Sequence, residues 1–413
     1  MSVTENAAAS ATESGRWPPV RVEILPIETL ADIHSRWRAS NQSVGVGMDA
    51  PDATNDPFWT EALCKTLLAG REASLAVALS GGVPVALFPF YRSVGRFSRL
   101  SFRELQAATN EYGGRCGILS ASRDPNALRE LLRGLVGREP KWGVLLLRTV
   151  VGSTGHRELV SALQGIPLRF EEIERERSPF IALPSTWEEV ARRLHKTLRK
   201  RIGKGQRDLE KAGVLAYREI RSPEQSREFL DIIADVERRS WKDASGVSIL
   251  ANDYQKRFYE AMVPRAASAG RLSGHILSLN ERPIAYMLGL LGQDRVYLAL
   301  KSSFDESVAA LSPGHVLKKL GICRLIERGA VAFDFMGRCD THKMYWTDQT
   351  YEVATLAIYN ASWRGRAAWL KRRIGGLRRT IPDEAPIPTR KDRDKPSAPA
   401  IKDNPGAGAG GTD

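Results

Sequence analysis

Residues 295–346 read RVYLALKSSFDESVAALSPGHVLKKLGICRLIERGAVAFDFMGRCDTHKMYW and carry the clearest structural signal in the chain. Their apolar runs predict a strand at 295–301, a helix at 313–328 and a second strand at 331–335. Ser312 is a preferred helix N-cap, and Pro313 suits the first helical position. Because the first amides of a helix are unpaired and carry a partial positive charge, this turn can bind a phosphate.

Four side chains in this stretch are candidates for chemistry: Asp305, Asp334, His342 and Lys343. A carboxylate in a buried strand needs a partner, and Arg338 or Lys343 could serve as the partner of Asp334. Such a pair fits a structural role as well as a catalytic one. Lys343 could also hold an anionic substrate or stabilise a developing oxyanion.

The rest of the chain alternates strand and helix patterns, and its two halves resemble each other. LAVALSGGVPVA at residues 75–86 and GHILSLNERPIA at 274–285 share a strand–turn–strand pattern, and Gly81-Gly82 predicts a hairpin turn. We therefore expect an α/β (α+β, mixed-sheet) protein built from a duplicated unit. The expected parts are a first half at 20–180, a second half at 181–360, a basic helix at 361–380, and disordered ends at 1–19 and 381–413.

Two basic segments stand out. A long helix is expected over 186–212, and residues 192–211 carry nine Lys or Arg around a helical row of apolar residues. This helix fits a solvated bridge between the halves, and it also fits one wall of a groove for an anionic ligand. Residues 363–379 carry seven Lys or Arg, and fit a terminal helix packed on the protein or a weak contact with an anionic membrane surface.

Composition narrows the possible classes of protein. The chain has 413 residues and a net charge of +13, which allows nucleic acid, anionic membrane or a polyphosphate small molecule as partner. No apolar run is long enough to predict a transmembrane helix. The four cysteines are scattered without metal-ligand spacing, so neither structural zinc nor a disulfide framework is expected. Reduced thiols fit a cytoplasmic protein.

These spaced motifs resemble the C-terminal acetyltransferase domain of the CelD/BcsL type. That GNAT-superfamily group is named for bacterial cellulose biosynthesis and is related to the tandem-GNAT FemABX transferases. The resemblance covers roughly residues 177–359 and, more faintly, 21–149. It rests on Phe304-Asp305, Ser312-Pro313-Gly314, Phe333-Asp334-Phe335, Gly337-Arg338, Lys343 and Trp346. The family's usual aromatic residue before the lysine is His342 here, which has no hydroxyl but can relay a proton.

The resemblance implies a donor site in the second half and a degenerate first half that shapes the acceptor groove. In such enzymes two neighbouring strands splay apart, the amides of one strand bind the pantetheine arm of an acyl-CoA, and the next helix holds its pyrophosphate. In this chain the donor-binding residues would be Tyr297, Leu298, Ala299, Leu300, Ser312, Pro313, Gly314 and His315. Arg338 and Trp346 would bind substrate, while Asp305, Asp334, His342 and Lys343 would supply catalytic groups.

The function implied by this resemblance is acyl transfer from acetyl-CoA or another acyl-CoA to an amine or hydroxyl. The acceptor that the resemblance suggests is a sugar or cell-envelope precursor in polysaccharide biosynthesis. Two alternatives stay open. One is FemABX-like transfer of an aminoacyl group from a charged tRNA, with the basic helix at 192–211 contacting RNA. The other is a GNAT-fold scaffold without catalytic activity.

Overall fold

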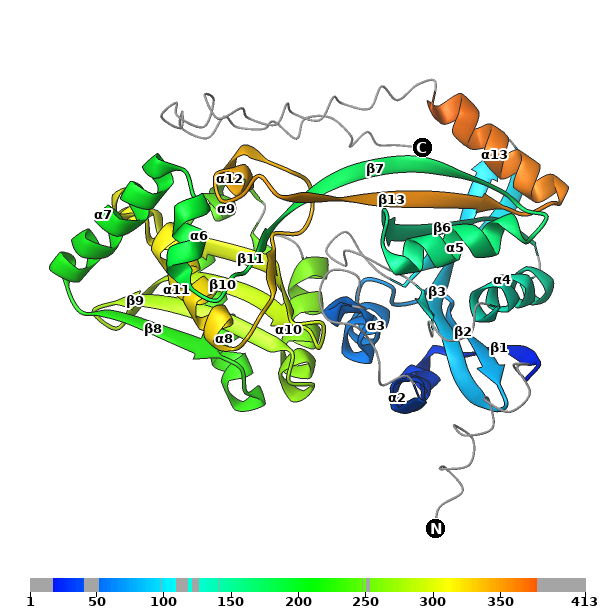
Figure 1. The fold of residues 1–413 in the computed structure, drawn as a ribbon, viewed down its shortest axis with the longest axis horizontal. Coiled ribbons are helices and arrows are strands. Elements are labelled where there is room, and N and C mark those ends of the chain that lie inside the picture. Colours follow the sequence, from blue (N-terminus) through cyan, green and yellow to red (C-terminus); the bar gives the residue numbers. More distant parts are fainter. Residues whose placement is uncertain are drawn as a thin grey trace, which may run out of the picture.

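The computed structural model describes residues 18–40, 52–97, 99–108, 118–120, 126–139, 141–246, 248–249 and 253–376. The expected disordered ends therefore lie almost wholly outside the described residues. Two lobes lie side by side, and the long strands β7 (Arg169–Ala182) and β13 (Thr350–Tyr359) run between them (Figure 1). Within the described ranges, no helix combines the length and the apolar character needed to cross a bilayer.

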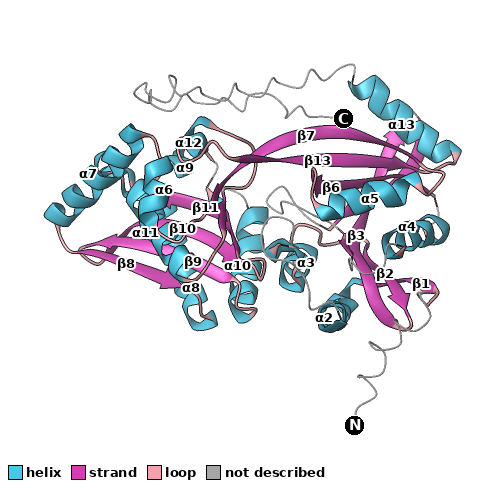
Figure 2. Cartoon of the chain, viewed as in Figure 1, coloured by secondary structure: helices cyan, strands magenta, loops and turns pink. Residues whose placement is uncertain are grey.

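The first lobe contains the elements up to β7, as Figure 2 shows by type. Besides β7 they are β1 (Val20–Pro26), η1 (Ile27–Thr29), α2 (Leu30–Ser40), η2 (Ala53–Asn55), α3 (Pro57–Lys65), β2 (Ala73–Ser80), β3 (Val83–Phe97), β4 (Leu100–Ala107), β5 (Leu119–Ser120), α4 (Ala127–Arg138), β6 (Trp142–Val150) and α5 (Thr154–Gln164).

Most later elements form the second lobe. They are α6 (Trp187–Arg193), α7 (Lys196–Ala212), β8 (Leu215–Ile220), η3 (Pro223–Gln225), α8 (Ser226–Arg238), α9 (Trp241–Ala244), α10 (Asp253–Ser268), β9 (Leu272–Leu279), β10 (Arg282–Leu291), β11 (Val296–Phe304), η5 (Glu306–Leu311), α11 (Pro313–Glu327), β12 (Ala332–Asp334) and α12 (Thr341–Met344). After β13, the helix α13 (Trp363–Gly376) returns to the first lobe, where it contacts β6.

The two lobes repeat one order of elements, which confirms the expected tandem α/β fold. The strands β2 and β3 join through Gly81 and Gly82, both at positive φ, as the sequence predicts. Their counterparts β9 and β10 join through Asn280 and Glu281, which adopt positive φ of 50° and 65°. Both connections are two-residue hairpin turns of the kind that matches the twist of paired strands.

One continuous sheet joins the lobes, in the order β1-β2-β3-β4-β6-β13-β7-β12-β11-β10-β9-β8. The strand β13 follows the second lobe in sequence, yet it pairs with β6 and β7 in the first. The strand β7 pairs with β13 up to Pro179 and with β12 from Phe180 onward. A cut at residue 180 would therefore pass through a shared strand.

The single helix expected over 186–212 is two helices, α6 and α7, so this prediction is wrong in detail. The chain leaves helical geometry at Leu194 and His195, whose ψ angles are 146° and 142°. The Nδ1 atom of His195 accepts a hydrogen bond from the Thr197 amide at 3.2 Å and so caps α7. A local side-chain cap here outweighs a continuous helical pattern.

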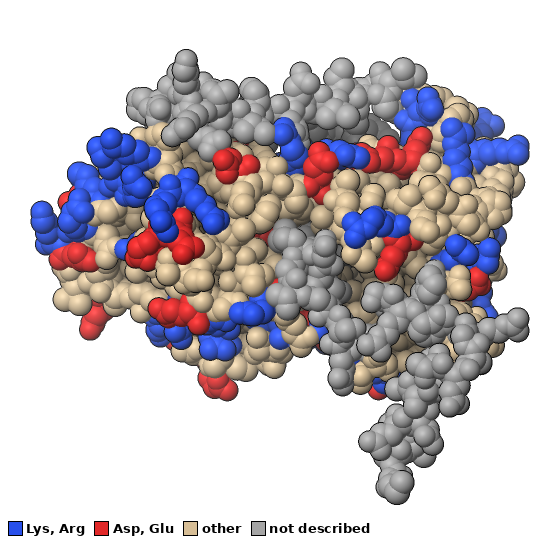
Figure 3. Space-filling view, viewed as in Figure 1, with Lys and Arg blue, Asp and Glu red and all other residues tan. Residues whose placement is uncertain are grey.

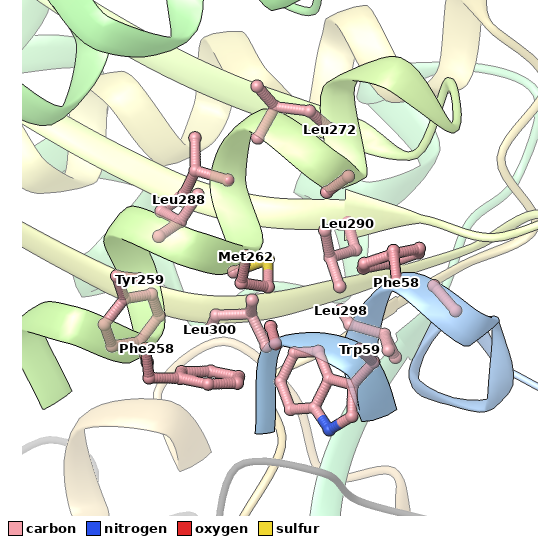
Figure 4. Close-up of a cluster of buried hydrophobic side chains, with 14 of the residues drawn as sticks. Phe58, Trp59, Phe258, Tyr259, Met262, Leu272, Leu288, Leu290, Leu298 and Leu300 are labelled. Carbon is pink, nitrogen blue, oxygen red and sulfur yellow. The ribbon is translucent and has the colours of Figure 1, made fainter. Parts of the chain in front are cut away.

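The first lobe contributes a helix to the hydrophobic core of the second. Phe58 and Trp59 of α3 pack among side chains of α10, β10 and β11, and Trp59 lies 5.0 Å from Phe258 between ring centroids (Figure 4). Beside this contact, the buried Asp56 accepts from Arg38 at 2.5 Å and from Arg271 at 2.6 Å. The apolar contact and the ion pairs both hold the lobes in one relative position.

Replacing Trp59 by alanine should destabilise both lobes together. Removing a fully buried indole typically costs about 3–5 kcal/mol. We expect one shifted urea transition, followed by circular dichroism, rather than separate transitions for each lobe. Val214→Ala is the control, because Val214 is 74% exposed and its loss should change the free energy of unfolding by less than about 0.5 kcal/mol. Two resolved transitions in the Trp59 variant would contradict the shared core.

Candidate functional site

The candidate site begins where two parallel strands separate. The strands β11 and β12 pair over only three residues each, and the last pair is Leu298 with Asp334. Beyond it β12 ends, while β11 continues to Phe304 with β10 along its other edge. At the same place the register with β10 shifts, so that Gly289 faces Ala299 and Leu288 faces Lys301, leaving Leu300 as the extra residue of a bulge. A bulge redirects backbone groups and is common beside active sites.

The side chains of the expected donor strand pack into the cores of the lobe. Tyr297 lies 5.0 Å from Phe333 between ring centroids, and its hydroxyl donates to the Ser273 carbonyl at 3.3 Å. Leu298 and Leu300 belong to the core under α10, and Ala299 packs toward α11. The side chains of Tyr297, Leu298, Ala299 and Leu300 thus serve packing, and a ligand-binding role for the backbone amides of this segment stays a prediction.

Asp305 has the contacts of a structural cap. Its side chain accepts from the Ser307 amide at 3.0 Å, from the Ser307 hydroxyl at 2.7 Å, and from Arg239 and Arg282. Burial raises the pKa of Asp305, but these hydrogen bonds and the two guanidinium charges outweigh it and leave the pKa below its ordinary value. Asp305 therefore fixes the start of η5 and remains ionised.

The turn into α11 follows at once. Pro313 is the first helical residue, as predicted, but the Ser312 side chain makes no capping hydrogen bond. Ser312 is left-handed at φ 55° because η5 runs directly into α11 and the chain must turn sharply between them. The helix α7 crosses close by, so that a Cβ atom on Gly205 would lie 2.6 Å from the Leu311 carbonyl oxygen. This close approach brings the basic helix beside the start of α11.

An aromatic and cationic cluster joins α11 to α12 and to the end of β12. The ring centroids of His315 and His342 are 5.6 Å apart, and those of His315 and Trp346 are 5.8 Å apart. The Lys318 ammonium lies 4.9 Å from the Phe335 ring centroid and 5.0 Å from that of Trp346, as in cation–π contacts. No short sequence pattern marks Lys318, because its aromatic partners come from distant segments.

The electrostatics of this cluster favour an anion. Burial lowers the pKa of Lys318 to about 8. Burial, His342, Lys318 and Arg201 of α7 lower the pKa of His315 to about 3. His342 reaches solvent along one side, yet the surrounding protein and Lys318 lower its pKa to about 4. Both imidazoles are therefore neutral at pH 7. Asp340 is the main acidic residue near the cations Lys318 and Lys343.

Asp334 is buried, and Arg338 and Lys343, the two partners suggested by the sequence, bind other groups. Its carboxylate accepts from the Met336 amide and from the Tyr351 hydroxyl, each at 2.8 Å. Arg338 instead pairs with Glu176 of β7 at 2.8 Å. The donor Tyr351 lies on β13, which is separated from β12 by β7 in the sheet, and the sequence gives no sign of that neighbour.

Lys343 holds a loop in place. Its ammonium donates to the carbonyl oxygens of Met336 at 2.9 Å and Arg338 at 3.0 Å. Met336 and Gly337 are both left-handed, so these contacts secure a sharp turn directly after β12. The turn sets the position of α12, and with it His342.

The structure thus brings part of the predicted site together. His315, His342, Lys343 and Trp346 converge between α11 and α12, whereas Asp305 and Arg338 engage in ion pairs at its margins. A separate cavity of about 320 Å³ opens between α7, β8 and α11. Its lining includes Gln206, Tyr217 and Leu320 but none of the cluster, so the cavity and the cluster are separate features of the lobe.

Residues 196–344 match the family described as "Acetyltransferase (GNAT) domain". No curated protein sequence matches the chain. Among solved structures, a conserved protein of unknown function from Bacteroides thetaiotaomicron is 13% identical, with 82% of this chain and 100% of that chain covered and a TM-score of 0.54. FemX is 11% identical, with 85% and 99% covered and a TM-score of 0.55. A tandem GNAT protein from the clavulanic acid biosynthesis pathway is 12% identical, with 83% and 99% covered and a TM-score of 0.44.

The likeness to the first two structures is one of fold, and it extends over most of this chain. The family match has a narrower range, and it contains the separated strands, the bulge and the turn into α11. Residues 196–344 thus match a GNAT acetyltransferase domain, and this match supports an acyltransferase.

Proposed function

We propose that the second lobe transfers an acyl group from an acyl-CoA thioester to an amine or hydroxyl. This proposal is supported by three features that lie close together: β12 ends, β11 bulges at Leu300, and the cationic cluster begins at the next helix. In this proposal the pantetheine arm lies along the free edge of β11 from Ala299 onward. The phosphates lie beside the start of α11, near Lys318 and Arg201.

The chemistry needs little beyond positioning and charge stabilisation. The acceptor's nitrogen or oxygen attacks the thioester carbon, the carbon–sulfur bond breaks, and the CoA thiolate leaves and takes up a proton. Backbone amides redirected by the bulge are the proposed donors to the oxyanion. His342 is the preferred base that removes the acceptor's proton, because its imidazole is neutral at pH 7. Asp334 and Asp305 rank below it because each carboxylate already accepts several hydrogen bonds.

The remaining residues have supporting roles in this proposal. Trp346 forms the floor under His315 and Lys318, and Lys343 positions the loop that carries His342. Arg338 lies toward the acceptor side, paired with β7 of the first lobe. That lobe shapes the acceptor groove and binds no donor of its own. A sugar or cell-envelope precursor in the cytoplasm is the proposed acceptor, on the strength of the sequence resemblance.

A second candidate donor is an aminoacyl-tRNA, and one observation favours it. The exposed side of α7 carries Lys196, Arg199, Lys200, Arg201, Lys204, Arg207 and Lys211, which gather at one end of the molecule (Figure 3). Only Lys204 forms an ion pair within the helix among the described contacts, with Asp208 at 2.6 Å. Binding of tRNA that weakens steeply with salt, without any response to acyl-CoA, would select this donor.

Lys318→Met should weaken acyl-CoA binding roughly tenfold or more, because a charge-assisted contact to phosphate is lost. The measurement is isothermal titration with acetyl-CoA and longer acyl-CoA species. Lys319→Met is the matched control: Lys319 is the next residue, but its ammonium donates to Gln206 at 2.6 Å, and affinity should stay within about twofold. Removing a buried cation should not lower the unfolding temperature of the Lys318 variant. Equal affinity in both variants would move the phosphate site elsewhere.

Acyl-CoA affinity should also fall as the pH rises through about 8, because Lys318 loses its proton there in the free enzyme. Stability should respond with the opposite sign. Between about 8 and the ordinary lysine pKa of 10.5, Lys318 is neutral when folded and protonated when unfolded, so it makes the free energy of unfolding rise with pH. Lys318→Met should flatten both profiles, measured by titration calorimetry and urea unfolding. Unchanged profiles in that variant would show that Lys318 is not the group responsible.

A further inference from the structure

The last described helix, α13, presents an apolar stripe to solvent. Trp363, Leu370 and Ile374 are 48%, 41% and 43% exposed, and spacings of seven and four residues put them on one side of the helix. The packed side adjoins this stripe, because Ala367, four residues after Trp363, and Ala368 are buried in a core cluster with Phe102 and Tyr359. The stripe is therefore the half-exposed border between the packed side and the solvent side of a firmly docked helix.

The sheet beside the helix extends this stripe. The ring of Phe102 on β4 belongs to the cluster under α13, and alternation along a strand places Leu100 on the same side of the sheet. Leu100 is 44% exposed. Scattered exposed apolar residues are common, but four large ones grouped at one helix indicate a contact surface.

Basic residues border the stripe and no acid interrupts it. Residues 361–376 contain Arg364, Arg366, Lys371, Arg372 and Arg373 and no Asp or Glu. Arg366 and Arg373 are exposed, and they lie four residues before Leu370 and three residues after it, so both lie along one side of the stripe. Of the other cations, Lys371 pairs with Glu104 at 3.2 Å, and Arg364 covers the Trp363 ring at 4.4 Å.

We infer that this face, formed by Leu100, Trp363, Arg366, Leu370, Arg373 and Ile374, docks on the surface of an anionic membrane. A helix that lies in the interface needs an apolar stripe, flanking cations and no acids, and a tryptophan is well suited to the headgroup level. Charge complementarity favours acidic lipid over a second copy of this chain, because two copies would bring their arginines together. Apolar burial and attraction to acidic headgroups would act together.

The basic helix α7 provides an internal control for membrane binding driven by charge alone. The basic helix α7 lies at the opposite end of the long axis from α13 (Figure 1). It is rich in exposed lysine and arginine. Among the described residues, the large apolar side chain exposed beside it is Val214, just beyond its end. If general charge drove binding, α7 would bind acidic vesicles as well as α13.

The test is flotation of the full chain with vesicles of phosphatidylcholine alone or with added phosphatidylglycerol. We expect binding only to the acidic vesicles, and a loss of roughly tenfold or more in the partition coefficient for Leu370→Ser/Ile374→Ser and for Arg366→Glu/Arg373→Glu. The matched control, Arg199→Glu/Lys200→Glu on α7, makes the same change in charge and should bind within about threefold of the wild type. Each variant's unfolding temperature confirms folding.

A fluorescence experiment tests which part of the protein contacts the membrane. Lipids brominated on the acyl chain should quench part of the tryptophan fluorescence of the wild type, and Trp363→Phe should remove that part. The inference is overturned if the wild type does not float with acidic vesicles, or if the α7 variant loses binding while both α13 variants keep it. It is also overturned if the α13 variants abolish a dimer seen by light scattering without affecting vesicles, since the face would then join two copies.

Discussion

The backbone ladder that β13 forms on both of its edges holds the whole arrangement together. All ten residues of β13 pair with β7, and seven of them also pair with β6. Because β7 continues past this contact to pair with β12, the same hydrogen-bonded ribbon reaches the strand at which the candidate site opens. Any displacement of one lobe against the other would have to break interstrand bonds, which makes relative motion of the lobes costly.

Two contacts connect the candidate site to this rigid sheet. Tyr351 of β13 donates to Asp334 at the end of β12, and Arg338 after β12 pairs with Glu176 of β7. Lys343 then closes the turn that leads to α12. The position of His342 is therefore set by a chain of contacts that starts in the sheet between the lobes. A site built in this way keeps its geometry before any ligand arrives, which is the condition under which fixed dipoles and charges stabilise a transition state best.

Local patterns predicted much of the fold because the relevant physics is local. The Gly81-Gly82 turn, the helix beginning at Pro313 and the strand around Phe333 all depend on neighbours close in sequence, and the structure confirms them. Contacts between distant segments escaped prediction. The Tyr351–Asp334 hydrogen bond and the aromatic surroundings of Lys318 join residues that no short-range period connects. The break at His195 was missed for another reason: one side-chain cap outweighed a continuous pattern of helical residues.

The placement of β13 also has a consequence for biosynthesis. The first lobe leaves the ribosome with β6 and β7 already made but with the strand that belongs between them still untranslated. At about 5–20 residues per second, the interval from Ala182 to Tyr359 lasts roughly 10 to 40 s. During that time two hydrogen-bonding edges lie open, and open edges are prone to pair with other chains. The nascent protein is thus expected to depend on chaperones that shield strand edges, and its yield in a heterologous host to depend on translation speed through the second half of the message.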